Sequence, residues 1–149
     1  MQDFLRFEPG APLSADPRIA KVSFTGSNAV GVQVMQRAAE TVKGVSLELG
    51  GKSPCIIDKE ANLDFAAKKV AWSKFINAGQ TCVAPDYLLV HEEVRDLFVA
   101  KLKETIVKMY GVNPRLSTDF ARIVSDRRCG SASGLADAIP MLCQCFTSA

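Results

Sequence analysis

The most restrictive feature of the sequence is a change of hydrophobic period in its first third. Residues 21–25 and 45–49 alternate polar and apolar side chains, which is typical of half-buried β-strands. Between them, residues 28–42 carry apolar side chains at helical spacing, with Ser27 as the expected N-cap and Gly44 as the expected stop. Two strands joined by one helix are expected to be parallel, so this segment predicts an α/β fold.

The next part of the chain continues the α/β pattern. Residues 55–57 and 87–90 are expected to form short buried strands. Helices are expected over residues 63–76, with Asn62 as N-cap, and over residues 92–110. The side chains expected to be buried are Phe65, Ala66, Val70 and Phe75 on the first helix, and Val94, Leu97, Phe98, Leu102, Ile106 and Met109 on the second.

Length and composition restrict the classes of function. The chain has 149 residues, a net charge of +2 and 23% charged residues, with acidic and basic side chains interleaved. This pattern gives no basic stripe for nucleic acid or for an anionic membrane. The N-terminus lacks a secretory signal, and no apolar run reaches the length of a membrane span. Five cysteines without a regular framework favour a reducing compartment, so we expect a soluble, cytoplasmic protein.

The turn over residues 26–31 is a candidate phosphate site. Gly26 allows close approach of the backbone, Ser27 adds a hydroxyl, and the following helix presents free N–H groups and the positive end of its dipole. These features suit a diphosphate. The alternative interpretation is a capped helix start without a ligand, because short glycine motifs often occur without one.

Two further residues are candidates for thiol chemistry. Cys82 is expected on the loop after Gly79, with Pro85 preventing a helix there, and a thiol on a loop can ionise. Glu48 ends a predicted strand 34 residues earlier (82 − 48) and could activate water against an acyl group on the thiol. Each residue also has a simpler interpretation, the cysteine as a small buried side chain and the glutamate as a surface charge.

Three alternative sites are weaker. The Gly-Lys-Ser run that ends at Ser53 lacks the glycine of a triphosphate-binding loop, because that position is Ser46 in a predicted strand. His91 could serve a Cys-His hydrolase, although it is more simply a polar residue at a helix start. A metal site would have to use Cys129, Cys143 and Cys145, which have neither a fourth ligand nor zinc-like spacing.

Three motifs occur in a fixed order: residues 24–27 with Gly31, residues 47–54, and residues 79–82. Together they resemble the aldehyde dehydrogenase superfamily, and residues 77–87 are most similar to its class 3, fatty and aromatic aldehyde branch. The resemblance extends from about residue 16 to residue 128 and implies part of a Rossmann-like parallel sheet that runs into part of an α/β catalytic domain.

The resemblance also implies roles for individual residues. Cys82 would be the nucleophile and Glu48 the general base of an enzyme that oxidises an aldehyde to a carboxylate with NAD or NADP. The backbone N–H of Cys82 would be one oxyanion donor. The residues expected to bind the cofactor are Gly26, Ser27, Asn28, Ala29, Val30, Gly31, Leu49 and Gly50.

The same resemblance predicts four segments. They are an irregular lead-in (1–20), a partial dinucleotide-binding unit (21–54), a partial catalytic domain (55–128) and a poorly packed or disordered tail unlike the family (129–149). The chain is expected to be an internal part of such an enzyme, without the strands through which the family forms homo-oligomers. The change in composition after Arg128 suggests a change of reading frame. The alternative function is a non-catalytic fragment that retains at most partial nucleotide binding.

Overall fold

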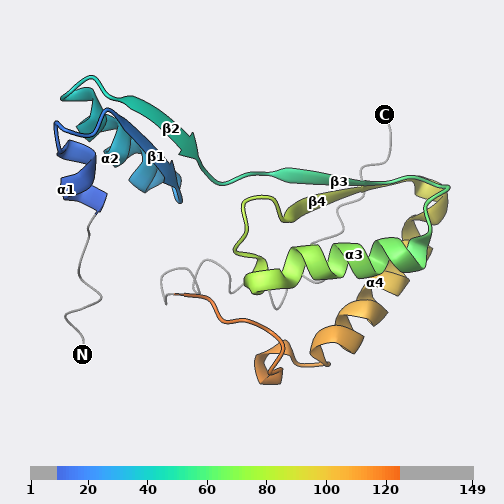
Figure 1. Cartoon of the computed structure of the whole chain (residues 1–149). Coiled ribbons are helices and arrows are strands. Elements are labelled where there is room, and N and C mark those ends of the chain that lie inside the picture. Colours follow the sequence, from blue (N-terminus) through green and yellow to red (C-terminus); the bar gives the residue numbers. More distant parts are fainter. Residues whose placement is uncertain (1–9, 125–149) are drawn as a thin grey trace. The chain divides into compact units, whose positions relative to one another are not determined.

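The computed structural model describes residues 10–124, and these form two compact units. Each unit contains one two-stranded parallel sheet with its own helices, so the predicted α/β fold with parallel strands is confirmed (Figure 1). The boundary between the units falls after Gly50. The sequence placed it after Pro54, but Ser53 and Pro54 already belong to the first strand of the second unit.

The first unit is a strand-helix-strand unit. β1 (Lys21–Thr25) and β2 (Gly44–Glu48) are parallel and in register, and α2 (Asn28–Ala39) joins them. Side chains on both strands alternate between half-buried and exposed, as a sheet covered on one face requires.

The lead-in contains a short helix, α1 (Gly10–Ala15), where the sequence predicted irregular structure. Lys43, which follows α2, donates hydrogen bonds from its Nζ to the carbonyl oxygens of Ser14 and Asp16. A six-residue helix leaves most of its carbonyl groups without intrahelical partners, and Lys43 satisfies one of them, that of Ser14.

The observed ends of α2 agree with the predicted N-cap, Ser27, but not with the predicted stop, Gly44. Ser27 is the N-cap, and its Oγ accepts a hydrogen bond from the N–H of Val30 at 3.4 Å, as predicted. The helix ends at Ala39, three residues before the predicted end. Val42 adopts a positive φ of 52°, which turns the chain early, and Gly44 is the first residue of β2 rather than the helix stop.

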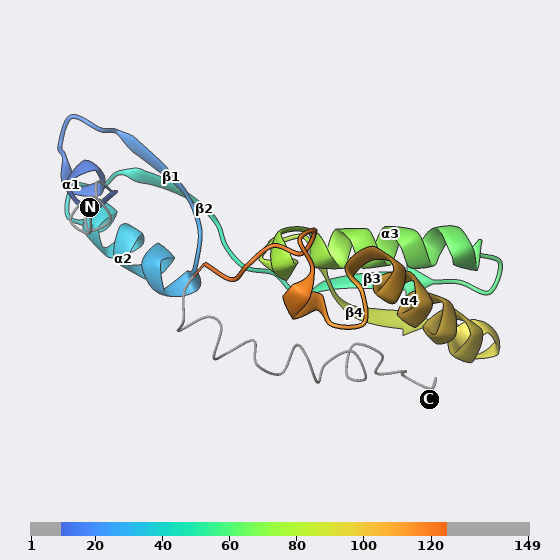
Figure 2. The same ribbon diagram turned by 90° about the horizontal axis from the view of Figure 1, so that it is seen from below.

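The second unit contains the larger core. β3 (Ser53–Ile57) pairs in parallel with β4 (Pro85–Val90). α3 (Leu63–Phe75) and α4 (Arg95–Tyr110) lie side by side on the same face of this sheet (Figures 1 and 2). Two short 3-10 turns, η2 (Ile76–Gly79) and η3 (Glu92–Val94), precede β4 and α4, and a third, η4 (Pro114–Leu116), follows α4.

Most predicted core positions are confirmed, and two are wrong. Val70, Phe75, Phe98, Leu102 and Ile106 are buried, while Ala66, Val94 and Met109 pack partly buried against them. Phe65 is 60% exposed and Leu97 is 55% exposed.

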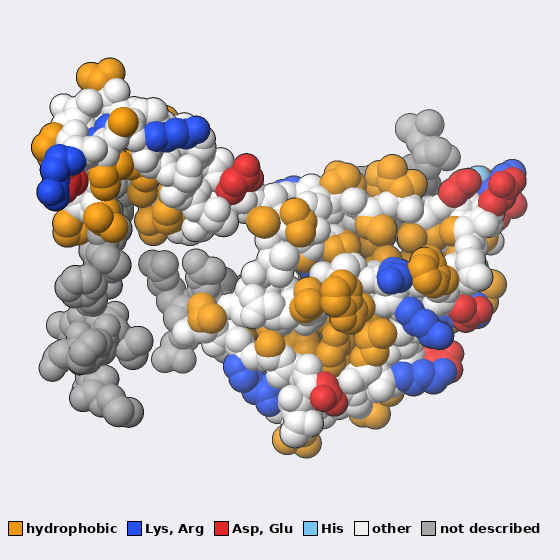
Figure 3. All heavy atoms as spheres, in the orientation of Figure 1, with side chains coloured by type: hydrophobic (Ala, Val, Ile, Leu, Met, Phe, Trp, Pro, Cys, Tyr) orange, Lys and Arg blue, Asp and Glu red, His pale blue; other side chains and the backbone are white. Residues whose placement is uncertain are grey.

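The buried positions of α3 include two small side chains, Ala67 and Ala71, which belong to the core. Phe65 sits on the outer face of α3, with the Nζ of Lys69 5.2 Å from its ring centroid. Figure 3 shows hydrophobic side chains gathered over α3, where Trp72 is also exposed.

The start of the predicted 92–110 helix differs in detail. Its first three residues form the turn η3, and Nδ1 of His91 accepts a hydrogen bond from the N–H of Glu93 at 3.3 Å. His91 is therefore the polar end residue that the sequence predicted. Gly111 ends α4 with a φ of 79°. Within residues 10–124, no helix is both long enough and apolar enough to span a bilayer.

Candidate active site

Cys82 lies on the loop between the C-terminal end of α3 and β4 (Figure 1). Three consecutive residues with positive φ make the turn into this loop: Asn77 (53°), Ala78 (54°) and Gly79 (77°). A left-handed conformation is costly for residues with a Cβ, and such strain is often found at functional sites. The predicted loop position of Cys82 is confirmed, and its side chain is exposed.

Local hydrogen bonds hold the loop. The N–H of Gln80 donates to the carbonyl oxygen of Asn77 at 3.2 Å, and Nδ2 of Asn77 donates to the carbonyl oxygen of Gln80 at 3.2 Å. Beyond Cys82, the N–H of Ala84 donates to the carbonyl oxygen of Thr81 at 3.1 Å. Cys82 therefore lies within the second of two consecutive hydrogen-bonded turns.

The start of β3 lies against the Cys82 loop. A Cβ atom on Gly51 would lie 2.8 Å from the carbonyl oxygen of Cys82, and Oγ of Ser53 lies 3.5 Å from the same oxygen. Nζ of Lys52 forms an ion pair with Oδ2 of Asp86 at 2.9 Å. Gly51 of the second motif therefore borders the cysteine loop, which carries the third motif.

Two thiols lie among the described residues, and they differ in environment. Cys55 is half-buried in β3 against the core, and burial raises the pKa of its thiol. Cys82 is exposed on its loop. Because the thiolate is the reactive form, the environment favours Cys82 over Cys55 as a nucleophile near neutral pH.

In the first unit, the candidate cofactor turn contacts the end of β2. The N–H of Gly26 donates to the carbonyl oxygen of Glu48 at 3.0 Å. Gly31 is buried, and a Cβ atom there would lie 2.9 Å from Cδ2 of Leu49. The fold of this unit thus brings the predicted turn together with the backbone of Glu48 and the side chain of Leu49.

The first turn of α2 is open to solvent. Asn28, Ala29 and Val30 lie in this turn, and Val30 is 43% exposed. Gly50 borders open space, because a Cβ atom there would have no neighbour within 4 Å. Val30 also lines a cavity of about 520 Å³, which Phe24 borders from β1 and Arg37 from α2. Val30 is the one candidate cofactor residue that lines this cavity.

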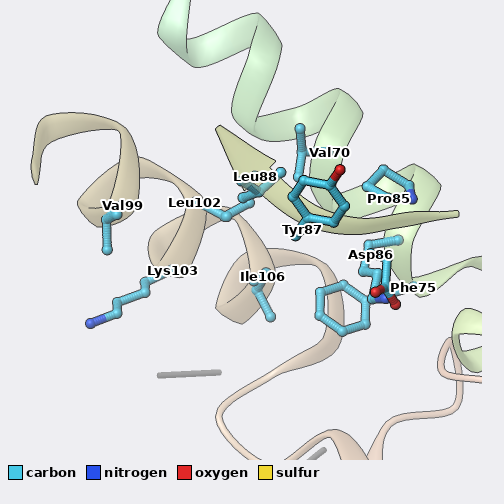
Figure 4. Close-up of a pocket in the computed structure, with 11 residues that line it drawn as sticks. Val70, Phe75, Pro85, Asp86, Tyr87, Leu88, Val99, Leu102, Lys103 and Ile106 are labelled. Carbon is cyan, nitrogen blue, oxygen red and sulfur yellow. The ribbon is translucent and has the colours of Figure 1, made fainter. Parts of the chain in front are cut away.

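A second, smaller cavity lies between α3, β4 and α4 (Figure 4). Its lining is largely apolar and includes Phe75, Leu88 and Ile106, with Asp86 and Lys103 among the polar side chains. Its volume is about 20 Å³, which is close to the room that one water molecule needs. This cavity is a packing space rather than a site for an organic substrate.

The alternative sites gain no support from the described residues. Cys82 precedes β4 and His91 follows it, so a six-residue strand, roughly 20 Å long, separates them. In the part of the chain that the structure describes, no three His, Cys, Asp or Glu side chains are arranged to hold a metal ion. The cysteines of the tail, and the predicted tail itself, lie outside the described residues.

Sequence reasoning missed several residues that shape the cysteine loop. The sequence predicts that the glycine pair makes a turn beside a ligand, whereas Gly51 makes room for the carbonyl of Cys82. The side chains of Asn77 and Gln80 had no predicted role. The run of Asn, Ala and Gly at residues 77–79 was the available signal, because Asn and Gly tolerate left-handed backbone.

Comparison with known proteins decides the family. The family model described as "Aldehyde dehydrogenase family" matches residues 7–137, which is wider at both ends than the resemblance seen in the motifs. The chain belongs to the aldehyde dehydrogenase family. The likeness to class 3 is also confirmed, because aldehyde dehydrogenase family 3 member A2 of Mus musculus is 46% identical over 110 residues, covering 74% of this chain and 23% of that protein.

Other relatives agree in sequence and in structure. "Aldehyde dehydrogenase, dimeric NADP-preferring" of Rattus norvegicus is 47% identical over 120 residues, covering 80% of this chain and 26% of that protein. The substrate-bound AldH of Staphylococcus aureus superposes with a TM-score of 0.77 at 42% identity, covering 90% of this chain and 29% of that chain. The chain thus spans about a quarter of the length of the aldehyde dehydrogenases that it matches.

Proposed function

We propose that this chain supplies the nucleophile and the general base of an NAD- or NADP-dependent aldehyde dehydrogenase. The observation that carries the proposal is the exposed thiol of Cys82 on a loop whose backbone is fixed by Gly51 and by two turns. Family membership gives the class of reaction, and the rat relative named as NADP-preferring supports the cofactor class.

In the proposed reaction, the thiolate of Cys82 adds to the carbonyl carbon of an aldehyde, and the carbonyl oxygen becomes an oxyanion. The backbone N–H of Cys82 stabilises this oxyanion as one hydrogen-bond donor. When bound, a nicotinamide cofactor would supply the oxidant for the loss of hydride from this adduct. A thioester on Cys82 remains, and water must then attack it.

Glu48 is the proposed base for that water. Its carboxylate takes a proton from the attacking water, the C–S bond breaks, and the carboxylic acid leaves Cys82. Glu48 belongs to the first unit and Cys82 to the second, but only two residues lie between Glu48 and Gly51. Three Cα–Cα steps span at most about 11 Å, so the length of chain between Glu48 and Gly51 permits the proposed pairing of base and nucleophile.

The first unit fits the proposed dinucleotide. The exposed first turn of α2 presents backbone N–H groups, which favour a diphosphate. Gly26 makes room for the ring of Phe24, because a Cβ atom there would lie 2.5 Å from Cζ of that ring. Gly31 and Leu49 would form the apolar support beneath the diphosphate. Gly26 to Gly31, Leu49 and Gly50 therefore remain the proposed cofactor-binding residues.

The test is a spectrophotometric assay of NADH or NADPH formation with an aromatic or medium-chain aldehyde. The proposal predicts turnover that Cys82→Ser abolishes and that Cys55→Ser, the matched cysteine control, retains. Equal turnover of the wild-type chain and Cys82→Ser would contradict it.

The non-catalytic alternative predicts a different result. A chain that only binds nucleotide would show a cofactor-dependent rise in its unfolding temperature without turnover, and its Cys82 would still react with electrophiles. The cytoplasmic location and the homo-oligomeric state expected of the family stay predictions.

A further inference from the structure

Gln80 lies two residues before Cys82, and its side-chain amide makes three hydrogen bonds. Nε2 donates to the carbonyl oxygens of Asn77 at 2.9 Å and of Arg122 at 3.3 Å. Oε1 accepts from the N–H of Val124 at 3.2 Å. A glutamine amide has two N–H donors and a carbonyl acceptor, so both of its functional groups are used.

The partners at the far end of these hydrogen bonds belong to an ordered segment, residues 114–124. The guanidinium of Arg122 donates to the carbonyl oxygens of Arg115 and Ser117, at 3.1 Å each, and also to that of Phe120. The ring of Phe120 packs edge-on against Tyr110 of α4, with centroids 5.3 Å apart. This segment is therefore attached to the core, and Gln80 attaches the cysteine loop to it.

We propose that Gln80 is a positioning residue for Cys82. It fixes the loop by bonding to backbone groups 42 and 44 residues further along the chain. The loop backbone, including the N–H of Cys82 that would face the oxyanion, is then held in one geometry. This inference rests on the proposed function, in which Cys82 is the nucleophile.

Positioning of this kind affects one reaction of the thiol more than another. Acylation by an activated ester passes through a tetrahedral oxyanion and depends on an aligned backbone N–H. Alkylation by iodoacetamide forms no oxyanion and depends on the thiolate alone. Loss of the Gln80 hydrogen bonds should therefore slow acylation of Cys82 relative to its alkylation, whereas a general loss of structure would change both.

The experiment measures both rates at Cys82 by mass spectrometry, with p-nitrophenyl acetate and with iodoacetamide. Gln80→Met keeps the length of the side chain and removes all three hydrogen bonds. Gln80→Asn keeps the amide but shortens its reach, and serves if the methionine variant does not fold. Gln36→Met, at an exposed position of α2, is the matched control.

In Gln80→Met, acylation of Cys82 is expected to fall about tenfold while alkylation changes less than about twofold. Gln80→Asn should show a smaller change in the same direction, and Gln36→Met none. Equal changes in both rates, or no change in either, would overturn the positioning role. If Cys82 of the wild-type chain is acylated no faster than N-acetylcysteine at the same pH, the proposed function itself is overturned, and this inference with it.

Discussion

Gly51 and the carbonyl oxygen of Cys82 are in contact so close that no side chain fits between them. A Cβ atom at residue 51 would lie 2.8 Å from that oxygen, which is nearer than real Cβ atoms approach a backbone. The contact joins the start of β3 to the cysteine loop. It explains in physical terms why glycine stands beside the Cys82 loop in this chain.

Gly51→Ala should therefore displace the Cys82 loop. We expect acylation of Cys82 by p-nitrophenyl acetate to fall about tenfold or more, and the free energy of unfolding to fall by about 1–3 kcal/mol. Gly44→Ala is the control, because its Cβ would meet only ordinary contacts, the nearest at 3.6 Å. An acylation rate in Gly51→Ala equal to that of the wild-type chain would show that the contact does not position the loop.

Gly31→Ala tests the proposed cofactor site. The new methyl group would crowd Leu49, with 2.9 Å to its Cδ2, while alanine in a helix gains about 1 kcal/mol over glycine. We expect the unfolding temperature without ligand to change little, and its rise with added NAD or NADP to fall by about half or more. Thermal unfolding with and without cofactor gives both values. If the cofactor raises the unfolding temperature of Gly31→Ala as much as that of the wild-type chain, Gly31 and Leu49 do not belong to the site.

The core of the second unit gives a stability prediction. Phe98 is completely buried among α3, α4 and the sheet, so Phe98→Ala should lower the free energy of unfolding by about 3–5 kcal/mol. Leu97 on the outer face of α4 is 55% exposed, so Leu97→Ala should lower the free energy of unfolding by no more than about 0.5 kcal/mol. Urea denaturation measures both, and similar costs for the two variants would contradict this arrangement of α4.

Cys55 should make stability depend on pH in the alkaline range. Burial raises the pKa of its thiol, so the unfolded chain releases this proton at a lower pH than the folded chain does. The free energy of unfolding should then fall as the pH rises from the ordinary thiol pKa towards the raised value.

Cys55→Ala should reduce this dependence without removing it, because burial also raises the pKa of Tyr110 and acts in the same direction. Urea denaturation at a series of alkaline pH values is the measurement. If the free energy of unfolding falls with pH equally steeply in Cys55→Ala and in the wild-type chain, the thiol of Cys55 ionises equally easily in the folded and the unfolded chain.

Local sequence predicted much of the fold. The alternation in residues 21–25, the N-caps Ser27 and Asn62, and the helical period before Gly111 all correspond to observed elements. Each of these signals depends on residues that are close together in the sequence, so it can be recognised without knowledge of the tertiary structure. The parallel pairing of β1 with β2 follows from the helix between them.

The remaining features depend on contacts that the local sequence does not encode. Period alone assigned Phe65 and Leu97 to buried faces, whereas on α3 the small side chains of Ala67 and Ala71 are the completely buried ones. The residue type of Ala78 does not encode its left-handed conformation, and the hydrogen bond from Gln80 to Arg122 joins residues 42 positions apart in the sequence. The loop position of Cys82 was predictable, whereas what holds that loop was not.

The most direct test of the proposed chemistry is to trap an acyl group on Cys82. In Glu48→Gln, treated with p-nitrophenyl acetate, Cys82 should be acetylated as in the wild-type chain and lose the acetyl group at least about tenfold more slowly, because no base activates water. Peptide mass spectrometry over time gives the site and both rates. Acetyl groups that accumulate equally on Cys55 and Cys82, or that leave Cys82 at the same rate in both chains, would contradict the assignment of nucleophile and base.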